Sequence, residues 1–234
     1  MSGKRISTVF LDAGETLVHP IPSFPELFRE VCASHGLTVD MMEVSRATRS
    51  LMAEVEERQK EGFTFSDHPE KSRRFWLDFY SRLVGELGYR GGDGLPWELY
   101  RVFSDPERYD AYPDAREAVS GLRERGFRLG LISNFEPWLE GLLARLGLAD
   151  YFSVLVISGK EGIEKPHPRL FGIALERVGA HPGECLHVGD SPNSDYRGAR
   201  EVGMRAVLLD RWGRHPFFPG ERISDLRELL TLLD

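Results

Sequence analysis

Two patterns of hydrophobic and polar residues divide this chain of 234 residues. From about Tyr109 onward, short continuous apolar runs alternate with stretches in which apolar residues recur at helical spacing. Continuous apolar strands with helices between them are typical of a parallel sheet that is covered on both faces. The pattern therefore predicts an α/β fold with a doubly wound parallel sheet. In such a fold, ligands are expected at the carboxyl ends of the strands.

The same pattern gives the expected elements. A first strand, Val9 to Leu11, lies near the N-terminus. Further strands are expected over residues 129–133, 153–158, 185–189 and 205–209. Helices are expected near residues 138–146, 170–178, 196–202 and 225–233.

Between Pro20 and about Pro106 the pattern is helical throughout. Helices are expected around Leu27, Phe28 and Val31, over residues 42–60, over residues 70–87, and after the turn-rich residues 91–96. Trp76 and Phe79 share the spacing of an interior face, which favours packing over ligand contact. The predicted division is a core of residues 1–20 and 107–234 with a helical insert of residues 21–106. The connections near residues 18–21 and 104–112 would serve as hinges.

Composition narrows the classes of partner and compartment. The formal net charge of -7 argues against a nucleic-acid partner, which would require a basic surface. Cys32 and Cys185 form no metal-binding or disulfide pattern, which indicates a reducing, cytoplasmic setting. No apolar run approaches the roughly 20 residues of a membrane span, and we expect neither a membrane partner nor a signal peptide. The sequence gives no indication of oligomeric state.

Four polar segments follow predicted strands in a fixed order. Asp12 ends the first strand, and Ser133-Asn134 ends the strand over residues 129–133. Lys165 precedes Pro166 beyond the next strand, and Asp190 follows the strand over residues 185–189, with Asp195 shortly after it. A single aspartate after a buried strand is an ordinary turn residue. Four such segments in this order point to a site.

These segments resemble the four motifs of the haloacid dehalogenase (HAD) superfamily. The resemblance runs from Val9 to about Leu209 and implies a HAD core with an inserted helical cap. It also implies that Asp12 is the nucleophile, that Ser133 and Asn134 bind a phosphoryl group, and that Lys165 neutralises charge. The first motif diverges from the family pattern, as in the group that includes HAD hydrolase domain-containing protein 3.

The chemistry of these residue types fits a magnesium cofactor. Magnesium prefers oxygen ligands, and Asp12, Asp190 and the backbone carbonyl of Gly14 can supply three. Lys165 adds positive charge between an anionic nucleophile and an anionic substrate. Asp195 is expected to orient a metal-bound water or Lys165 rather than to bind the metal. Its alternative role is structural, because an aspartate in the first turn of a helix interacts favourably with the helix dipole.

One expected group is missing. The superfamily motif reads Asp-x-Asp-Gly-Thr, and its second aspartate is the general acid and base; this chain has Gly14 there. Glu15 is adjacent but one residue out of position, while His19 and His167 are expected at the surface or at a helix start. The enzyme would then hydrolyse phosphates whose leaving group needs no proton, or take its acid from the cap or the substrate, or bind phosphorylated ligands with little turnover.

Two branches of the superfamily also lack the second aspartate. The 2-haloacid dehalogenases replace the first acidic residue of the fourth motif with serine, whereas Asp190 is acidic here. Phosphonate hydrolases use a lysine of the cap, and the candidates Lys60 and Lys71 lie in charged segments typical of a solvated face. The sequence thus favours a magnesium-dependent hydrolase, a phosphatase acting on a small phosphorylated metabolite. A dehalogenase, a phosphonate hydrolase and a nearly inactive phosphate-binding protein remain as alternatives.

Overall fold

A parallel β-sheet forms the centre of the computed structural model, which describes residues 5–233. Its six strands follow the order β5-β4-β1-β6-β7-β8, and every neighbouring pair is parallel. The strands are β1 Thr8–Leu11, β4 Arg128–Ser133, β5 Val154–Ile157, β6 Cys185–Gly189, β7 Arg205–Leu209 and β8 Arg222–Ile223. The predicted doubly wound α/β class is confirmed. The short edge strand β8 was not predicted, because two residues make no hydrophobic run.

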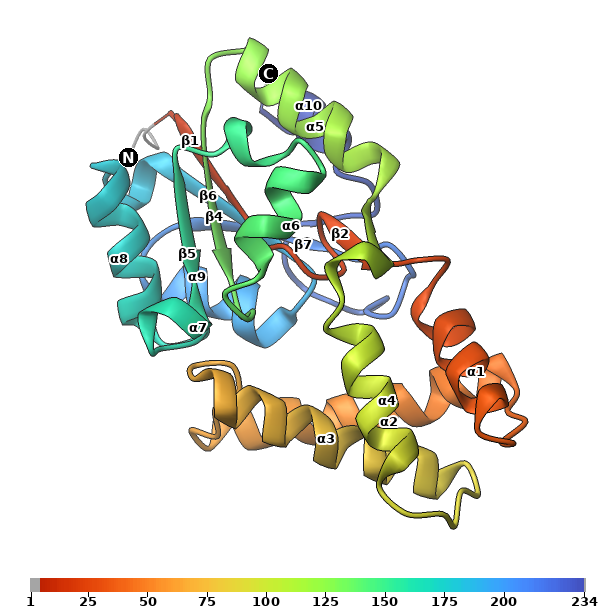
Figure 1. The fold of residues 1–234 in the computed structure, drawn as a ribbon. Helices are drawn as coiled ribbons and strands as arrows, with labels where there is room; N and C mark the ends of the chain where they lie inside the picture. The colour runs from red at the N-terminus through yellow and green to blue at the C-terminus, as the bar shows by residue number, and fades with distance from the viewer. Residues whose placement is uncertain (1–4, 234) are drawn as a thin grey trace.

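Helices cover both faces of the sheet (Figure 1). They are α5 Pro113–Glu124, α6 Leu139–Arg145, α7 Ser158–Glu161, α8 Pro168–Val178, α9 Gly198–Glu201 and α10 Glu228–Leu232. Short 3₁₀ turns lie at η1 Pro106–Arg108, η2 Ala149–Tyr151 and η3 Pro182–Glu184. Val9 and Leu11 pack in the cluster that includes α5, α6 and α10, whereas Phe10 packs with α8 and α9. This alternation follows from the two-residue period of a strand.

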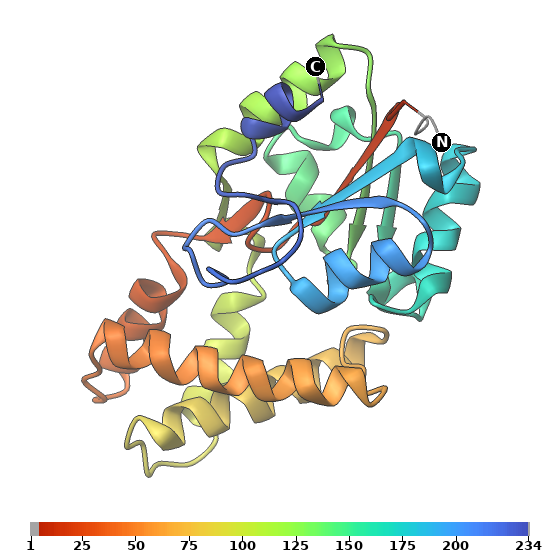
Figure 2. The same ribbon diagram turned by 180° about the vertical axis from the view of Figure 1, so that it is seen from behind.

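A separate helical unit, which we call the cap, consists of α1 Phe24–Ser34, α2 Met41–Lys60, α3 Pro69–Glu86 and α4 Gly94–Phe103. Ser23 and Asp40 cap the first two helices by accepting hydrogen bonds from backbone N–H groups. The cap has its own hydrophobic cluster, in which Phe79 is buried and against which Trp76 packs. Their predicted interior position is therefore confirmed. In Figure 2 the long helix α2 crosses the view on the cap side of the sheet.

The two connections between cap and core form one structure. Strands β2 Val18–Pro20 and β3 Tyr109–Ala111 pair antiparallel as a separate two-stranded sheet. The sequence predicted that both connections serve as hinges, but three-residue strands gave no pattern that would reveal their pairing. Because the connections are hydrogen-bonded to each other, we expect them to move together.

The segment after β6 departs from the helix expected near residues 196–202. A π-helical turn, η4 Pro192–Arg197, comes first, and α9 is only its short continuation. The N–H groups of Asp195 and Tyr196 both donate to the carbonyl of Ser191, at 3.1 Å each. The wider turn brings the Asp195 carboxylate back toward the start of the segment, and such turns are frequent at functional sites. No helix in the described part of the chain has the length and hydrophobicity to cross a bilayer.

Candidate active site

The four polar segments meet at the carboxyl ends of the central strands. Asp12 directly follows β1, Ser133 ends β4, and Asp190 directly follows β6. Figure 1 shows the arrow of β4 pointing toward the cap side of the molecule. Among the described residues, Asp12, Asp190 and Asp195 each place a carboxylate oxygen within 4.8 Å of the others. We call these three residues the acidic cluster.

Lys165 supplies the positive charge of this cluster. Its side chain is buried, and Nζ lies 2.6 Å from Oδ1 of Asp12 and 2.6 Å from Oδ1 of Asp195. Nζ also donates to the carbonyl of Ile132 at 2.9 Å. All three contacts of the ammonium are therefore made by core residues, and the amine is fixed between two carboxylates.

Asn134 has a use that differs from the expected contact with substrate. Its Oδ1 accepts from the backbone N–H of Lys165 at 2.6 Å, and its Nδ2 donates to the Lys165 carbonyl at 2.8 Å. Both ends of the carboxamide are thus engaged by the same residue. The side chain therefore positions Lys165, and the second N–H of its Nδ2 is the donor that remains for a phosphoryl oxygen.

Asp195 is held by groups on both sides. Its Oδ1 accepts from Lys165 and lies 2.8 Å from Nε2 of His187, while its Oδ2 accepts from the N–H of Ser191 at 3.0 Å. His187 is fully buried in β6 and packs edge-on against Phe171. Sequence reasoning missed His187, because a histidine within an apolar strand carries no motif. Its partner lies on the π-helical turn, which was not predicted.

Burial and charge shift the titration of these groups in different directions. Burial, followed by repulsion from Asp12 and Asp195, raises the pKa of Asp190 well above its usual value. Burial also raises the pKa of Asp12, although Lys165 opposes the change. For Asp195, burial is outweighed by Lys165 and His187, so its pKa is lowered. Burial likewise disfavours the charged form of Lys165, but Asp12 and Asp195 outweigh it and raise its pKa.

Ser133 lies at the edge of this cluster, where its hydroxyl is close enough to the Asp12 carboxyl to oppose the rise in its pKa. The residue is 1% exposed, and its Oγ has no hydrogen-bond partner among the described residues. Burying a hydroxyl without a partner costs free energy, so such a group is uncommon in a folded core. The hydroxyl is therefore available to a bound oxyanion.

The turn after β1 lacks a side chain where the family pattern has its general acid. A Cβ built on Gly14 would meet only the ring of Phe135, at 3.6 Å, which is ordinary van der Waals contact. Glu15 has a left-handed backbone, with φ 54, and its carboxylate accepts from the hydroxyl of Tyr112 at 2.9 Å. The acid next to Gly14 is thus bound to a neighbouring aromatic residue.

The other candidates for proton transfer and Schiff-base chemistry have structural contacts. His167 is exposed and caps α8, as expected for a residue at a helix start. The ring of His19 packs against the ring of Tyr112, with 4.3 Å between the ring centroids. Lys60 and Lys71 are exposed and pair with Glu57 and Asp67. These contacts fit the solvated faces predicted for both lysines.

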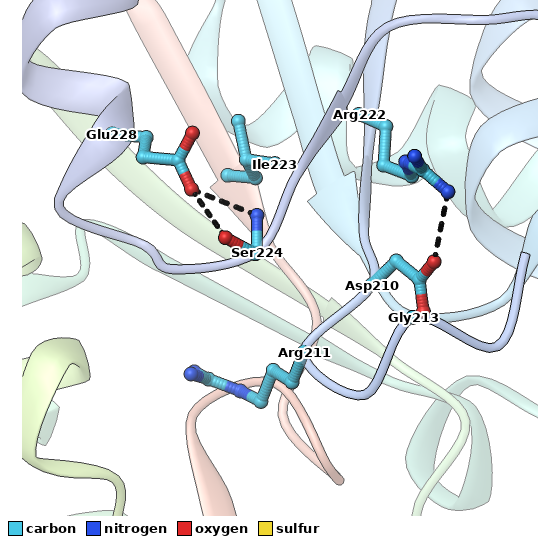
Figure 3. A pocket seen from close by; sticks show the side chains of 7 residues that line it. All are labelled: Asp210, Arg211, Gly213, Arg222, Ile223, Ser224 and Glu228. Carbon is cyan, nitrogen blue, oxygen red and sulfur yellow. Dashed lines mark hydrogen bonds and ion pairs between the residues drawn. The ribbon is translucent and has the colours of Figure 1, made fainter. Parts of the chain in front are cut away.

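A hollow of about 300 Å³ lies away from the acidic cluster, beyond the end of β7 (Figure 3). It is lined by Asp210, Arg211, Gly213, Arg222, Ile223, Ser224 and Glu228. Its charged groups already have partners: Arg222 lies 3.1 Å from Asp210, Arg211 pairs with Asp114, and Glu228 accepts from the N–H and hydroxyl of Ser224. Because no member of the acidic cluster lines it, we do not place the active site there.

The acidic cluster fits a divalent cation. Three carboxylates share one small region with a single ammonium, and the described residues give Asp190 no ion-pair partner. A hard cation with oxygen ligands would relieve the repulsion that raises the pKa of Asp190. Asp12 and Asp190 are the two side chains that could hold it, since both oxygens of Asp195 are already engaged, Oδ1 by Lys165 and His187 and Oδ2 by the Ser191 N–H.

Comparison with known proteins agrees with this geometry. The model of the haloacid dehalogenase-like hydrolase family matches residues 6–203. The chain is 31% identical over 214 residues to haloacid dehalogenase-like hydrolase domain-containing protein 3 of Bos taurus, covering 86% of this chain and 83% of the relative.

Two further relatives have names that state an activity. Phosphoserine phosphatase of Thermus thermophilus is 45% identical over 132 residues, which are 54% of this chain and 53% of the relative. Glyceraldehyde 3-phosphate phosphatase of Pyrococcus abyssi is 33% identical over 213 residues, covering 86% of this chain and 80% of the relative.

Proposed function

Because the chain belongs to the haloacid dehalogenase-like hydrolase family, we propose that it is a magnesium-dependent phosphatase that acts through an aspartyl phosphate on Asp12. The observation that carries the proposal is the placement of Lys165, whose Nζ lies 2.6 Å from both Asp12 and Asp195 in a cluster that Asp190 completes. A nucleophilic carboxylate, a fixed ammonium and a further carboxylate that could hold a metal ion are groups that phosphoryl transfer to an aspartate uses.

The proposed reaction has two displacements at phosphorus. A carboxylate oxygen of Asp12 forms a bond to phosphorus, while the bond from phosphorus to the leaving oxygen breaks with its electron pair. Water then attacks the same phosphorus, and the Asp12 carboxylate leaves. Lys165 and the unpartnered hydroxyl of Ser133 would hold the phosphoryl oxygens as negative charge builds on them. Magnesium held by Asp12, Asp190 and the carbonyl of Gly14 would neutralise the carboxylates and polarise a phosphoryl oxygen.

The substrate class is a small phosphorylated metabolite. The relatives named for phosphoserine and for glyceraldehyde 3-phosphate act on alkyl phosphates, whose leaving oxygen needs a proton. Gly14 supplies none in this chain. Either the preferred substrates here have better leaving groups, such as acyl or aryl phosphates, or the proton comes from Glu15, the cap or the substrate. The assay below separates these cases.

A substrate panel tests the proposal. Phosphate release is measured from acetyl phosphate, p-nitrophenyl phosphate, phosphoserine and glyceraldehyde 3-phosphate, with magnesium and with a chelator. Magnesium-dependent turnover of at least one compound is the expected result. Halide release from a 2-haloacid without metal would instead favour a dehalogenase. Binding of inorganic phosphate without any turnover would favour a phosphate-binding protein.

A further inference from the structure

Glu164, the residue before Lys165, faces away from the acidic cluster and contacts the cap. The residue is 2% exposed. Its Oε2 accepts from the backbone N–H groups of Phe65, at 2.9 Å, and Ser66, at 2.5 Å, and from the Ser66 hydroxyl at 2.8 Å. Its Oε1 accepts from Nε2 of Gln59, near the end of α2, at 3.3 Å. One core carboxylate therefore receives every one of these hydrogen bonds from the cap.

A second core residue holds the same point of the cap. Ser158, which follows β5, places its Oγ 2.7 Å from the hydroxyl of Ser66 and 3.0 Å from the Ser66 carbonyl. Its Oγ also accepts from the N–H of Phe135 at 2.9 Å. The backbone and side chain of Ser66 are thus bound entirely by core groups. Figures 1 and 2 both show the connection between α2 and α3 beside the core, next to α7.

The contacts between the Phe65–Ser66 loop and the core are of a kind that can break and form again at low cost in free energy. They are hydrogen bonds, and each of the groups involved would find water as a partner if the cap moved away. Replacing protein hydrogen-bond partners by water changes the free energy little. Opening a large apolar interface would cost more, because its apolar surface would become exposed to water. The chain itself joins cap and core only through the segments of β2 and β3, so these hydrogen bonds are what holds the α2–α3 connection to the core.

The position of Glu164 in the chain links this closure to the chemistry. One peptide bond separates it from Lys165, whose backbone Asn134 holds from the other side. If the Glu164 carboxylate lost its donors from the cap, water molecules would take their place next to Lys165.

We propose that Glu164 is a positioning residue: one residue from Lys165, it latches the Phe65–Ser66 loop of the cap onto the core and so holds the cap closed. This inference rests on the proposed phosphatase function. A closed cap then excludes water while Asp12 attacks phosphorus, and an open cap admits it.

Three variants separate the latch from a general effect on folding. Glu164→Ala removes every acceptor, and we expect kcat to fall about tenfold or more while KM for p-nitrophenyl phosphate changes less than about threefold. Glu164→Gln retains an amide oxygen for Phe65 and Ser66, and the Gln59 amide can turn to accept its N–H; kcat should stay within about threefold of the parent. Glu161→Ala is the matched control, because Glu161 lies in the same segment and pairs with Arg177 of the core.

Amide hydrogen exchange of the full chain gives a readout that needs no turnover. In the parent, the N–H groups of Phe65 and Ser66 should be protected, and Glu164→Ala should abolish that protection while β1 and β4 stay protected. Unchanged protection of the loop in Glu164→Ala overturns the latch, and so does lost protection with an unchanged kcat in an active enzyme. Failure of the parent to turn over any phosphate would count against the proposed function alone, since the exchange result stands without it.

Discussion

The surroundings of Lys165 and the turn after β1 contribute to the same site but are built differently. Around Lys165, the ammonium, its backbone and the neighbouring Asp195 are all fixed by hydrogen bonds to core residues. In the turn, Gly14 presents no side chain, and Glu15 is bound to Tyr112. The first region fixes charged groups, whereas the second has no side chain at position 14, where the family pattern has its general acid.

The difference separates two requirements of phosphoryl transfer. Stabilising the charge of the transition state depends on fixed ions, and Lys165 is fixed here between Asp12 and Asp195. Protonating the leaving group is a separate contribution of about 10²–10⁴ in rate, and it matters only for poor leaving groups. A site with the first and without the second should be selective in leaving-group chemistry rather than inactive.

The largest expected effect comes from the nucleophile. Asp12→Asn should abolish turnover, because an amide cannot form the covalent intermediate, while the buried position at the end of β1 tolerates an isosteric side chain. Steady-state rates on the best substrate of the panel provide the measurement, and circular dichroism verifies the fold. Asp150→Asn, at an exposed position, serves as a control. Residual activity above about 1% of the parent would contradict covalent catalysis by Asp12.

Restoring the missing acid should change proton transfer at the turn after β1 and leave the surroundings of Lys165 as they are. The pair Gly14→Asp with Glu15→Gly reproduces the family pattern. The Cβ of a side chain at position 14 would make only ordinary contact with Phe135, and glycine suits the left-handed backbone of Glu15, so we expect the variant to fold. Turnover of alkyl phosphates should rise by up to about 10²–10⁴, with little change for acyl phosphates.

The measurement is the slope of log kcat/KM against the pKa of the leaving group. The parent should show a steep slope, and the double variant a flatter one. Glu15→Gly alone is the matched control and should leave the slope steep. If the parent hydrolyses alkyl phosphates without a slope, another residue donates the proton. A loss of that activity in Glu15→Gly would then identify Glu15 as the acid.

A smaller effect should follow from loosening Lys165. Asn134→Ala removes the partners of the Lys165 N–H and carbonyl, and kcat should fall roughly tenfold as the ammonium loses its fixed position. Leaving these buried groups unpaired should also lower stability by about 1–3 kcal/mol. Kinetics and denaturant unfolding measure the two effects. An increase in KM with unchanged kcat would instead indicate that Asn134 contacts substrate.

The sequence predicted the site residues that lie at strand ends. It did not predict contacts between residues that are far apart in the chain. Asp12, Ser133 and Asp190 end up together because parallel strands bring their carboxyl ends to one edge, a consequence of local hydrophobic pattern. The partners of Asn134 and Glu164 could not be predicted in this way. Asn134 contacts a residue 31 positions away, and Glu164 contacts the loop of a separate unit 98 positions away. Neither distance leaves any trace in local spacing.

The smallest expected effect concerns stability and has an unusual sign. Burial and the neighbouring carboxylates raise the pKa of Asp190 in the folded chain. A group with a raised folded-state pKa binds more protons when folded than when unfolded, so the free energy of unfolding decreases as pH rises through the interval between the two values. Without magnesium, Asp190→Asn should therefore raise the midpoint of thermal unfolding at pH 7, by a few degrees.

The pH and metal dependence of this difference provide the decisive measurements. The midpoints of parent and variant should converge near pH 4, close to the unfolded pKa of about 3.9, because the parent carboxyl is then largely protonated in the folded chain. Added magnesium should stabilise the parent by mass action and leave the variant unchanged. Asp210→Asn is the control of opposite sign: although burial opposes it, the N–H groups of His215 and Arg214 lower the pKa of Asp210, so its removal should destabilise the chain at pH 7. A lower midpoint for Asp190→Asn in chelator at pH 7 would mean that Asp190 stabilises the fold itself. The interpretation that Asp190 destabilises the metal-free chain because its site is built for a cation would then be wrong.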